Sequence, residues 1–291
     1  MRTVDGILLV HKLAGYTSQD VCHLIKKKLH VQKVGHCGTL DPFAEGLLII
    51  GLNQGTKILP YLEKEKKTYL ATLKLGSQTT TLDKTGEIMQ NQPIPSFDKN
   101  TLDKVFASLI GKQQQIPPMY SAIKVNGKKL YEYARKNITI ERKPREIEIY
   151  DLQLIDFEKD WIQFEVTCSK GTYIRTLGEE MAKKLHTVGH LTQLIRTRIG
   201  QYELQNAISM DALDSFTVCI PIYQAVPFPY QKAPDALIPL IKDGKPLFYQ
   251  SDDPLILWVN DQMRALAIYQ KENENEYRCV RGFYDENCFH S

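Results

Sequence analysis

The sequence contains no long apolar run, and none of its hydrophobic stretches approaches the roughly 18 residues that a membrane-spanning helix requires. The beginning of the chain, MRTVDGILLVHKL, also lacks the basic start and long apolar stretch that are typical of a signal peptide. We therefore expect a cytoplasmic protein with no membrane partner.

Motifs for metals and nucleotide cofactors are missing as well. The six cysteines include no CxxC pair and follow no regular spacing, which indicates reduced thiols and argues against a zinc site. Neither the phosphate-binding pattern GxxxxGK(S/T) nor a GxGxxG that follows a strand occurs. The sequence thus predicts a protein that uses neither a metal nor an organic cofactor.

What is present is the composition of an ordinary globular protein, with 43% hydrophobic and 24% charged residues over 291 positions. That length suits two unequal domains. A Pro-rich tract, with prolines at positions 221, 227, 229, 234 and 239, predicts a boundary near residue 230. We expect a first domain over residues 1–230 and a small β domain over residues 231–291, where LILWVN and MRALAIY predict short strands.

The net charge of +3 is too small to identify a partner, but the basic residues are unevenly distributed. Between Lys124 and Arg145 there are eight basic and two acidic residues, and Tyr131 and Tyr133 lie among them. Basic groups with interleaved aromatic rings can contact phosphates and stack on bases, which favours RNA as the partner. A solvated surface loop would show the same composition, so the segment alone leaves both interpretations open.

Hydrophobic periodicity predicts both helices and strands. Strands are expected over GILLVHK from Gly6, over residues 67–75, and repeatedly between residues 138 and 168. Helices are expected after a Thr17–Ser18 cap, over residues 102–110 with Gly111 as the end, over SKGTYIRTLGEEMAKKL, and briefly near Ser209.

Two polar turns interrupt these elements: GHCGTLDPFAEG, which we expect to be a functional loop, and residues 170–175. An Asp before Pro is common in ordinary turns, so Asp41 taken alone is either a turn residue or a catalytic acid. A nucleophilic pair of Cys37 and His36 is not supported, because sequence neighbours rarely align for proton transfer. No second carboxylate lies near enough in sequence to suggest a glycosidase pair.

Five segments carry motifs in a fixed order: KLAGYTS, VGHCGTLDPFAEGLL, KKTY, CSKGTYIRTL and LTQLIRTRIG. Together they resemble the motifs of the TruB-type pseudouridine synthases over about residues 4 to 215. The resemblance places the catalytic Asp at Asp41 and an active-site Tyr at Tyr69. It places a further Tyr and Arg at Tyr173 and Arg175, and the leucine that approaches the active site at Leu194.

The resemblance implies that the chain isomerises uridine to pseudouridine at position 55, in the T-arm of tRNA, without a cofactor or a metal. In that reaction the glycosidic bond breaks, the uracil turns, and the sugar is rejoined to C5 of the base. The target uridine must be flipped out of its folded loop, which costs a few kcal/mol of stacking. We expect tRNA to be the partner and the enzyme to be a monomer.

The resemblance also assigns roles. Asp41 is the essential carboxylate and Arg175 its partner, since a neighbouring guanidinium favours the ionised form. Tyr69 would stack on the uracil and assist the late deprotonation at C5. The residues expected to bind or position the substrate are four. Tyr173 would support Arg175 or the base, and His36 would either occupy the space left by the flipped base or stabilise the flipped conformation. Leu194 would approach the active site, and Lys12 is assigned to positioning.

The implied fold is the α/β pseudouridine synthase fold, with a large mixed, mainly antiparallel sheet. A basic insertion over about residues 117–145, including Lys124, Lys128 and Lys129, would grip the tRNA. Residues 231–291 would form a small PUA-like RNA-binding domain.

Two alternatives differ from this interpretation. One is a non-catalytic RNA-binding protein with the same fold, which the motif positions of Asp41, Tyr69 and Arg175 argue against, since a binder has no need of a carboxylate facing anionic RNA. The other is a guide-RNA-dependent pseudouridylase. The short C-terminal region and the lack of basic tails favour an enzyme that works without guide RNA.

Overall fold

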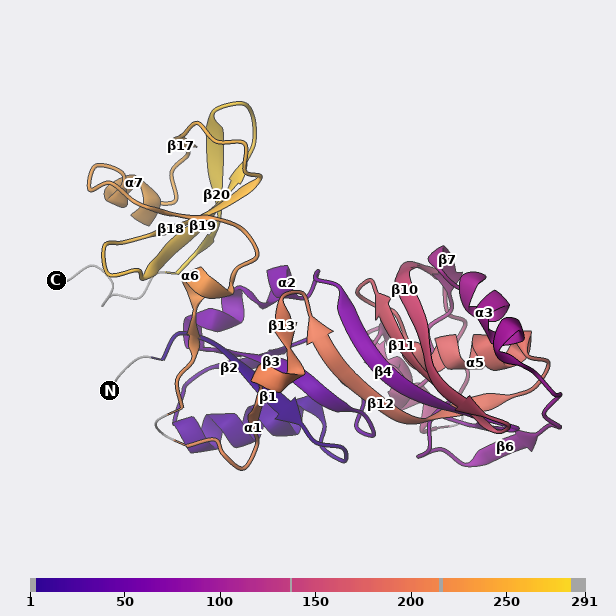
Figure 1. The fold of residues 1–291 in the computed structure, drawn as a ribbon. Helices are drawn as coiled ribbons and strands as arrows, with labels where there is room; N and C mark the ends of the chain where they lie inside the picture. The colour runs from indigo at the N-terminus through magenta and orange to yellow at the C-terminus, as the bar shows by residue number, and fades with distance from the viewer. Residues whose placement is uncertain (1–3, 137, 215–216, 284–291) are drawn as a thin grey trace.

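The computed structural model describes residues 4–136, 138–214 and 217–283. An 11-stranded sheet runs through the long body of the molecule, and a five-stranded sheet stands at one end of it (Figure 1). The main path of the large sheet is β14 (Ile208–Ser209), β1 (Gly6–Lys12), β3 (Glu45–Leu52), β12 (Gly189–Ile199), β4 (Lys67–Leu75), β11 (Trp161–Cys168), β10 (Arg145–Glu158) and β7 (Gly111–Gln115). Off this path lie β2 (Val34–Cys37), β13 (Tyr202–Glu203) and β15 (Ile220–Pro221).

The large sheet is mixed and mainly antiparallel, as expected. Only the pairs β1–β14 and β12–β3 are parallel among its described ladders. Strand β4 matches its predicted bounds, because its buried positions alternate with half-buried ones over most of its length. Its neighbours β12 and β11 come from distant parts of the chain, so β4 brings Tyr69 into the middle of the sheet.

The helices and 3-10 helices are short. They are α1 (Ser18–Leu29), η1 (Asn53–Lys57), α2 (Leu59–Leu62), α3 (Lys99–Ala107), α4 (Leu130–Ala134), α5 (Ile174–Lys184), η2 (Leu204–Asn206), α6 (Ile222–Ala225) and α7 (Ile238–Lys242). The predicted start of α1 is confirmed. Thr17 is its N-cap, and the Asp20 side chain accepts a hydrogen bond from the Thr17 backbone in return.

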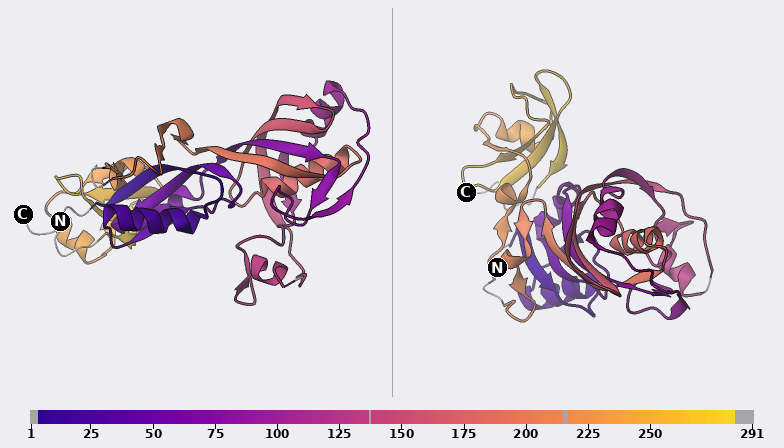
Figure 2. Two further views of the ribbon diagram at one scale, coloured as in Figure 1. Left: turned by 90° about the horizontal axis from the view of Figure 1, so that it is seen from below. Right: turned by 45° about the vertical axis from the view of Figure 1, so that its right-hand side comes forward.

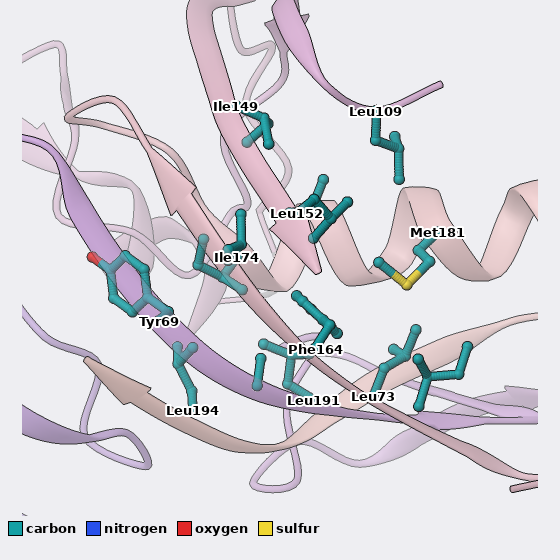
Figure 3. Packing of buried hydrophobic residues seen from close by; sticks show 14 of the residues in the cluster. Tyr69, Leu73, Leu109, Ile149, Leu152, Phe164, Ile174, Met181, Leu191 and Leu194 are labelled. Atoms are coloured by element: carbon teal, nitrogen blue, oxygen red, sulfur yellow. The ribbon is translucent and has the colours of Figure 1, made fainter. Parts of the chain in front are cut away.

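Helix α5 packs its apolar face on the large sheet. Ile174, Leu177 and Met181 are buried against residues of β4, β11 and β12. Figure 3 shows Tyr69 at one end of this cluster, with its hydroxyl pointing away from the labelled aliphatic side chains. The core therefore fixes the Tyr69 ring while leaving its polar end directed out of the cluster.

Three local expectations were wrong. The start of the predicted loop, Val34–Cys37, is the strand β2, paired with β3. The helix expected over residues 102–110 ends at Ala107, and Gly111 begins β7 instead of ending the helix. Near Ser209 there is no helix but the two-residue strand β14, because residues 208–209 pair with β1 and this tertiary pairing overrides the local pattern.

The basic insertion forms a lobe of its own. It contains the hairpin of β8 (Lys124–Val125) and β9 (Lys128–Lys129), followed directly by α4. Figure 2 shows this lobe projecting from the sheet. A second hairpin, β5 (Ser77–Thr79) and β6 (Ile88–Asn91), precedes it in the chain.

The five-stranded sheet contains β16 (Tyr230–Lys232), β18 (Leu255–Val259), β19 (Ala265–Lys271), β20 (Glu276–Gly282) and β17 (Leu247–Phe248). It rests on the body through one continuous hydrophobic cluster, in which Leu257 and Phe283 join Ile7 and Leu62. Among the described residues, no helix is long and apolar enough to cross a membrane.

Candidate active site

The Asp41 carboxylate lies in the loop between β2 and β3 and is held by Arg175, in the first turn of α5. Arg175 Nε donates to Asp41 Oδ2 at 2.8 Å, and its NH2 nitrogen donates to Oδ1 at 3.1 Å. The Arg175 side chain is 3% exposed, whereas that of Asp41 is 30% exposed. The predicted pair therefore forms, with its guanidinium buried and its carboxylate accessible.

Arg175 also connects two further segments to the site, namely the turn that holds Thr81 and Asp83 and the start of the basic lobe. Its NH1 nitrogen donates to the Thr81 carbonyl and its NH2 nitrogen to the Tyr120 carbonyl, both at 2.8 Å. The NH1 nitrogen lies 3.8 Å from Oδ2 of Asp83, a buried carboxylate. Since Tyr120 lies at the root of the basic lobe, one guanidinium connects that lobe to Asp41.

Asp83 was not identified from the sequence. Its Oδ1 accepts hydrogen bonds from the Thr81 hydroxyl and from the backbone and hydroxyl of Thr85. The polar run TTTLDKTGE was the only local signal, and it indicated no more than a turn. Arg175 thus lies between two carboxylates, of which only Asp41 is accessible.

Lys12 is fully buried and supports the Asp41 loop. Its Nζ lies within hydrogen-bonding distance of the carbonyls of Leu13 and Tyr16 on one side, at 3.0 and 2.7 Å. On the other side it reaches those of Pro42 and Ala44, at 3.5 and 2.6 Å. Burial lowers the Lys12 pKa from 10.5 to about 8, although the Asp41 carboxylate opposes this shift. Lys12 therefore positions the loop that carries Asp41 and is not exposed for contact with a substrate.

Tyr69 and Leu194 form an apolar wall. They are 8% and 4% exposed and belong to one cluster with Leu40 and Phe43 of the Asp41 loop. Burial raises the Tyr69 pKa to about 12, and the positive charge of nearby Arg196 opposes the rise. Tyr69 is therefore a neutral hydroxyl near neutral pH.

His36 and Tyr173 flank this arrangement. His36 is half-buried in β2, and its Nδ1 has no hydrogen-bond partner among the described residues. Burial lowers its pKa, with nearby Arg196 adding to the effect, so the ring is neutral at physiological pH. Tyr173 is the N-cap residue of α5 and exchanges two hydrogen bonds with the Gln115 side chain; burial raises its pKa. Tyr173 thus lies close enough to Asp41 for its pKa to be raised by that charge, whereas His36 lies near Arg196, and neither side chain bonds to the Asp41 carboxylate among the described hydrogen bonds.

Lys124, Lys128 and Lys129 are not brought together with the Asp41–Arg175 pair. Lys124 and Lys128 are exposed on the hairpin of the projecting lobe, and Lys129 lies over the Tyr131 ring with its Nζ 5.4 Å from the ring centroid. Cations and an aromatic face are therefore available on the lobe, as the sequence predicted.

The described residues contain no group of three or more His, Cys, Asp or Glu side chains that could hold a metal ion. A surface cavity of about 470 Å³ involves Thr68, Thr167 and Thr197. Since Thr68 and Tyr69 are neighbours on one strand, that cavity opens on the face of the sheet opposite to Tyr69. The site therefore combines an accessible carboxylate, a buried guanidinium and a tyrosine hydroxyl beside an apolar wall. The carboxylate can act on an uncharged ring as a nucleophile or as a proton acceptor.

Comparison with known proteins finds relatives of one family. The profile of the family described as TruB family pseudouridylate synthase (N terminal domain) matches residues 26–174. The chain is 51% identical to the tRNA pseudouridine synthase B of Hydrogenovibrio crunogenus over 197 residues, which cover 68% of this chain and 65% of that protein. The protein of the same name from Mesoplasma florum is 36% identical over 282 residues, covering 96% of this chain and 98% of that one. The chain thus spans less than two thirds of the first relative and nearly all of the second.

Solved structures share the fold at low sequence identity. The crystal structure of a Cbf5-Nop10-Gar1 complex contains a chain that superimposes with a TM-score of 0.69 at 19% identity, covering 100% of this chain and 88% of that chain. An H/ACA RNP bound to a substrate RNA gives a TM-score of 0.68 at 18% identity, covering 98% and 87%. At this identity the likeness establishes the fold alone.

Proposed function

Because the chain belongs to the TruB family of pseudouridylate synthases, we propose that it isomerises uridine to pseudouridine at position 55 in the T-arm of tRNA. The observation that carries the proposal is the accessible Asp41 carboxylate, held at both oxygens by buried Arg175. A protein that only binds anionic RNA gains nothing from such a carboxylate. The relatives named above, which carry the name tRNA pseudouridine synthase B, indicate the same substrate class.

Asp41, Arg175 and Tyr69 have different roles in this reaction. Asp41 attacks the nucleotide or accepts a proton from its sugar, while Arg175 holds both carboxylate oxygens in place. The bond between N1 and C1′ breaks, the uracil turns, and C5 bonds to C1′ of the sugar; C5 then loses its proton and N1 gains one. The Tyr69 ring and Leu194 provide an apolar surface on which the freed uracil can turn. No step requires a cofactor, and the atoms of product and substrate are the same.

The remaining predicted residues prepare the substrate. The target uridine reaches Asp41 only after it is flipped out of the T-loop, at a cost of a few kcal/mol in lost stacking. Neutral, half-buried His36 would fill the vacated space, and Tyr173 would support Arg175. Lys124, Lys128 and Lys129 would contact phosphates of the arm, a contribution that weakens with salt.

The direct test is to incubate the protein alone with an unmodified T-arm stem-loop and to map pseudouridine along the product. Pseudouridine at position 55 without added RNA supports the proposal. Binding without product supports the non-catalytic alternative, and product only after addition of a guide RNA supports the guide-dependent alternative. A stem-loop with cytidine at position 55 is the control for site selection.

We also propose that the enzyme acts as a cytoplasmic monomer, with the catalytic domain over residues 1–230 and a PUA-like RNA-binding domain over residues 231–291. The C-terminal strands support a boundary near residue 230, since β16 begins at Tyr230 and pairs with β18 of the small sheet. Sedimentation of the free protein and of its complex with tRNA would check the monomer.

A further inference from the structure

Arg196 lies in β12, between the two strands that carry the active-site residues. Its backbone is opposite Gly46 of β3 on one side and opposite Tyr69 of β4 on the other. The residue is 1% exposed. Arg196 therefore contacts both the strand that follows the Asp41 loop and the strand that carries Tyr69. Because it is buried, a substrate cannot reach it.

The Arg196 guanidinium contacts both ends of the Asp41 loop and lies beside Tyr69. Its Nε donates to the Leu47 carbonyl at 2.8 Å, and its NH2 nitrogen donates to the Gly38 carbonyl at 3.2 Å. Tyr69 is the residue opposite Arg196 on β4, and the charge of Arg196 lowers the Tyr69 pKa against the effect of burial. Gly38 precedes Asp41 and Leu47 follows it, so one planar group joins both ends of the loop next to Tyr69.

Gly38, at the start of the loop, and Gly46, near the start of β3, allow the chain to lie close to Arg196. A Cβ on Gly46 would lie 2.4 Å from the Arg196 carbonyl oxygen, and a Cβ on Gly38 would lie 3.7 Å from the Arg196 NH1 nitrogen. Both glycines have positive φ, +116° and +70°. The loop is thus shaped to lie closely against Arg196.

Arg196 is an unusual buried arginine because no ion pair found among the described residues includes it. Arg175, by contrast, faces Asp41 and Asp83, and exposed Arg198 on the same strand pairs with Glu203 at 2.6 Å. A buried guanidinium without a carboxylate partner is costly, and an apolar side chain would often suit such a position equally well. Simple packing therefore does not account for an arginine here.

We propose that Arg196 is a positioning residue for the reaction put forward above, and this inference rests on that proposed function. By holding Gly38 and Leu47 to one guanidinium directly beside Tyr69, Arg196 fixes the distance between Asp41 and Tyr69. Arg175 orients the carboxylate itself, whereas Arg196 orients the loop that carries it and the tyrosine opposite.

The test compares Arg196→Met with Arg198→Met, which removes an exposed guanidinium two positions away on the same strand. With a T-arm stem-loop as substrate, Arg196→Met should lower kcat by about 100-fold and leave KM unchanged, because misplacement of reacting groups acts on the chemical step. Arg196→Lys, which keeps a charge and part of the donor set, should recover some of kcat. Arg198→Met should behave like the wild type.

A double variant separates positioning of Tyr69 from a general loss of structure. Because Arg196 acts partly through Tyr69, Arg196→Met combined with Tyr69→Phe should lower kcat by less than the product of the two single losses. A kcat near the wild-type value in Arg196→Met, or losses that multiply, would overturn the inference.

Hydrogen exchange gives a readout that does not depend on activity. In the full-length protein, Arg196→Met and Arg196→Lys should speed amide exchange over residues 38–47, and Arg198→Met should not. If the wild type forms no pseudouridine, the proposed function is wrong. The rate of amide exchange then tests by itself whether Arg196 holds the Asp41 loop in place. Unchanged exchange in folded Arg196 variants would then refute it.

Discussion

Both nitrogens on one edge of the Arg175 guanidinium engage the Asp41 carboxylate, with Nε 2.8 Å from Oδ2 and NH2 3.1 Å from Oδ1. The same guanidinium donates hydrogen bonds to the Thr81 and Tyr120 carbonyls, and these contacts fix the plane of the guanidinium. The orientation of the carboxylate is thus set by contacts from three separate segments. Variants of either residue should therefore lose activity.

Asp41→Asn should abolish turnover while RNA binding is kept. The amide has nearly the shape of the carboxylate but carries no charge, so it neither attacks nor accepts a proton, and a loss of about 1000-fold or more is expected for an essential group. Pseudouridine formation and stem-loop affinity should be measured on the same preparation. Asp103→Asn, in an exposed ion pair on α3, is the matched control. Turnover retained by Asp41→Asn would remove Asp41 from its assigned role.

Arg175→Lys should lower kcat by about 100-fold, because an ammonium cannot make the two parallel bonds or reach both carbonyls at once. Arg175→Met should also destabilise the fold, since removing one partner of a buried pair costs about 3–5 kcal/mol. Stopped single-turnover assays and urea unfolding would measure the two effects. Arg198→Lys, at an exposed ion pair, should change neither quantity.

Asp83→Asn should lower kcat less than Asp41→Asn does, by about 10-fold. Asp83 Oδ2 lies 3.8 Å from the Arg175 NH1 nitrogen, so its charge balances the guanidinium from the side away from Asp41. Without that charge, Arg175 attracts the Asp41 carboxylate more strongly, which makes the carboxylate a weaker nucleophile. A measured kcat equal to the wild-type value would show that Asp83 serves the fold alone.

The sequence predicted those parts of the molecule whose signals are local. Alternation predicted β4 at its observed bounds, and the Thr17–Ser18 cap predicted the start of α1. The strand β14 was missed because its two residues become a strand only by pairing with β1.

The site divides in the same way. Asp41 and Arg175 were found because the resemblance marks both, although neither loop shows the ion pair by itself. Asp83 and Arg196 were missed, because their contacts with Arg175 and with the ends of the Asp41 loop exist only in the folded sheet. Lys12 was assigned to positioning, and its four carbonyl contacts lie within the segments that support the Asp41 loop.

Replacing Lys124, Lys128 and Lys129 with Gln should weaken stem-loop binding and leave kcat at saturating substrate unchanged. Each lost phosphate contact should reduce the slope of log K against log salt by about 0.7–0.9. Titrations at several salt concentrations would measure this slope. The control replaces exposed Lys99, Lys104 and Lys112, which removes the same charge from a different surface. Equal slopes for the two triple variants would argue against the lobe as the RNA contact.

The buried ammonium of Lys12 should make stability depend on alkaline pH. Its folded pKa, about 8, lies below the ordinary value of 10.5, so between these values the unfolded chain binds more protons than the folded protein. The free energy of unfolding therefore rises with pH across this window, by about 3 kcal/mol in total from this group. Below pH 8 the folded protein bears the full cost of the buried charge.

Lys12→Met lacks this titration, so comparing it with the wild type isolates the contribution of Lys12 from that of other alkaline groups. The wild type should gain stability relative to Lys12→Met as the pH rises from 7 to 10.5, measured by urea unfolding at each pH. Lys99→Met, which removes an exposed amine, should show a difference from wild type that does not vary with pH.

The activity of the wild type should change in the opposite direction to its stability. A neutral amine has fewer N–H groups to share among the four carbonyls, so kcat of the wild type should fall above pH 8 even as the fold becomes more stable.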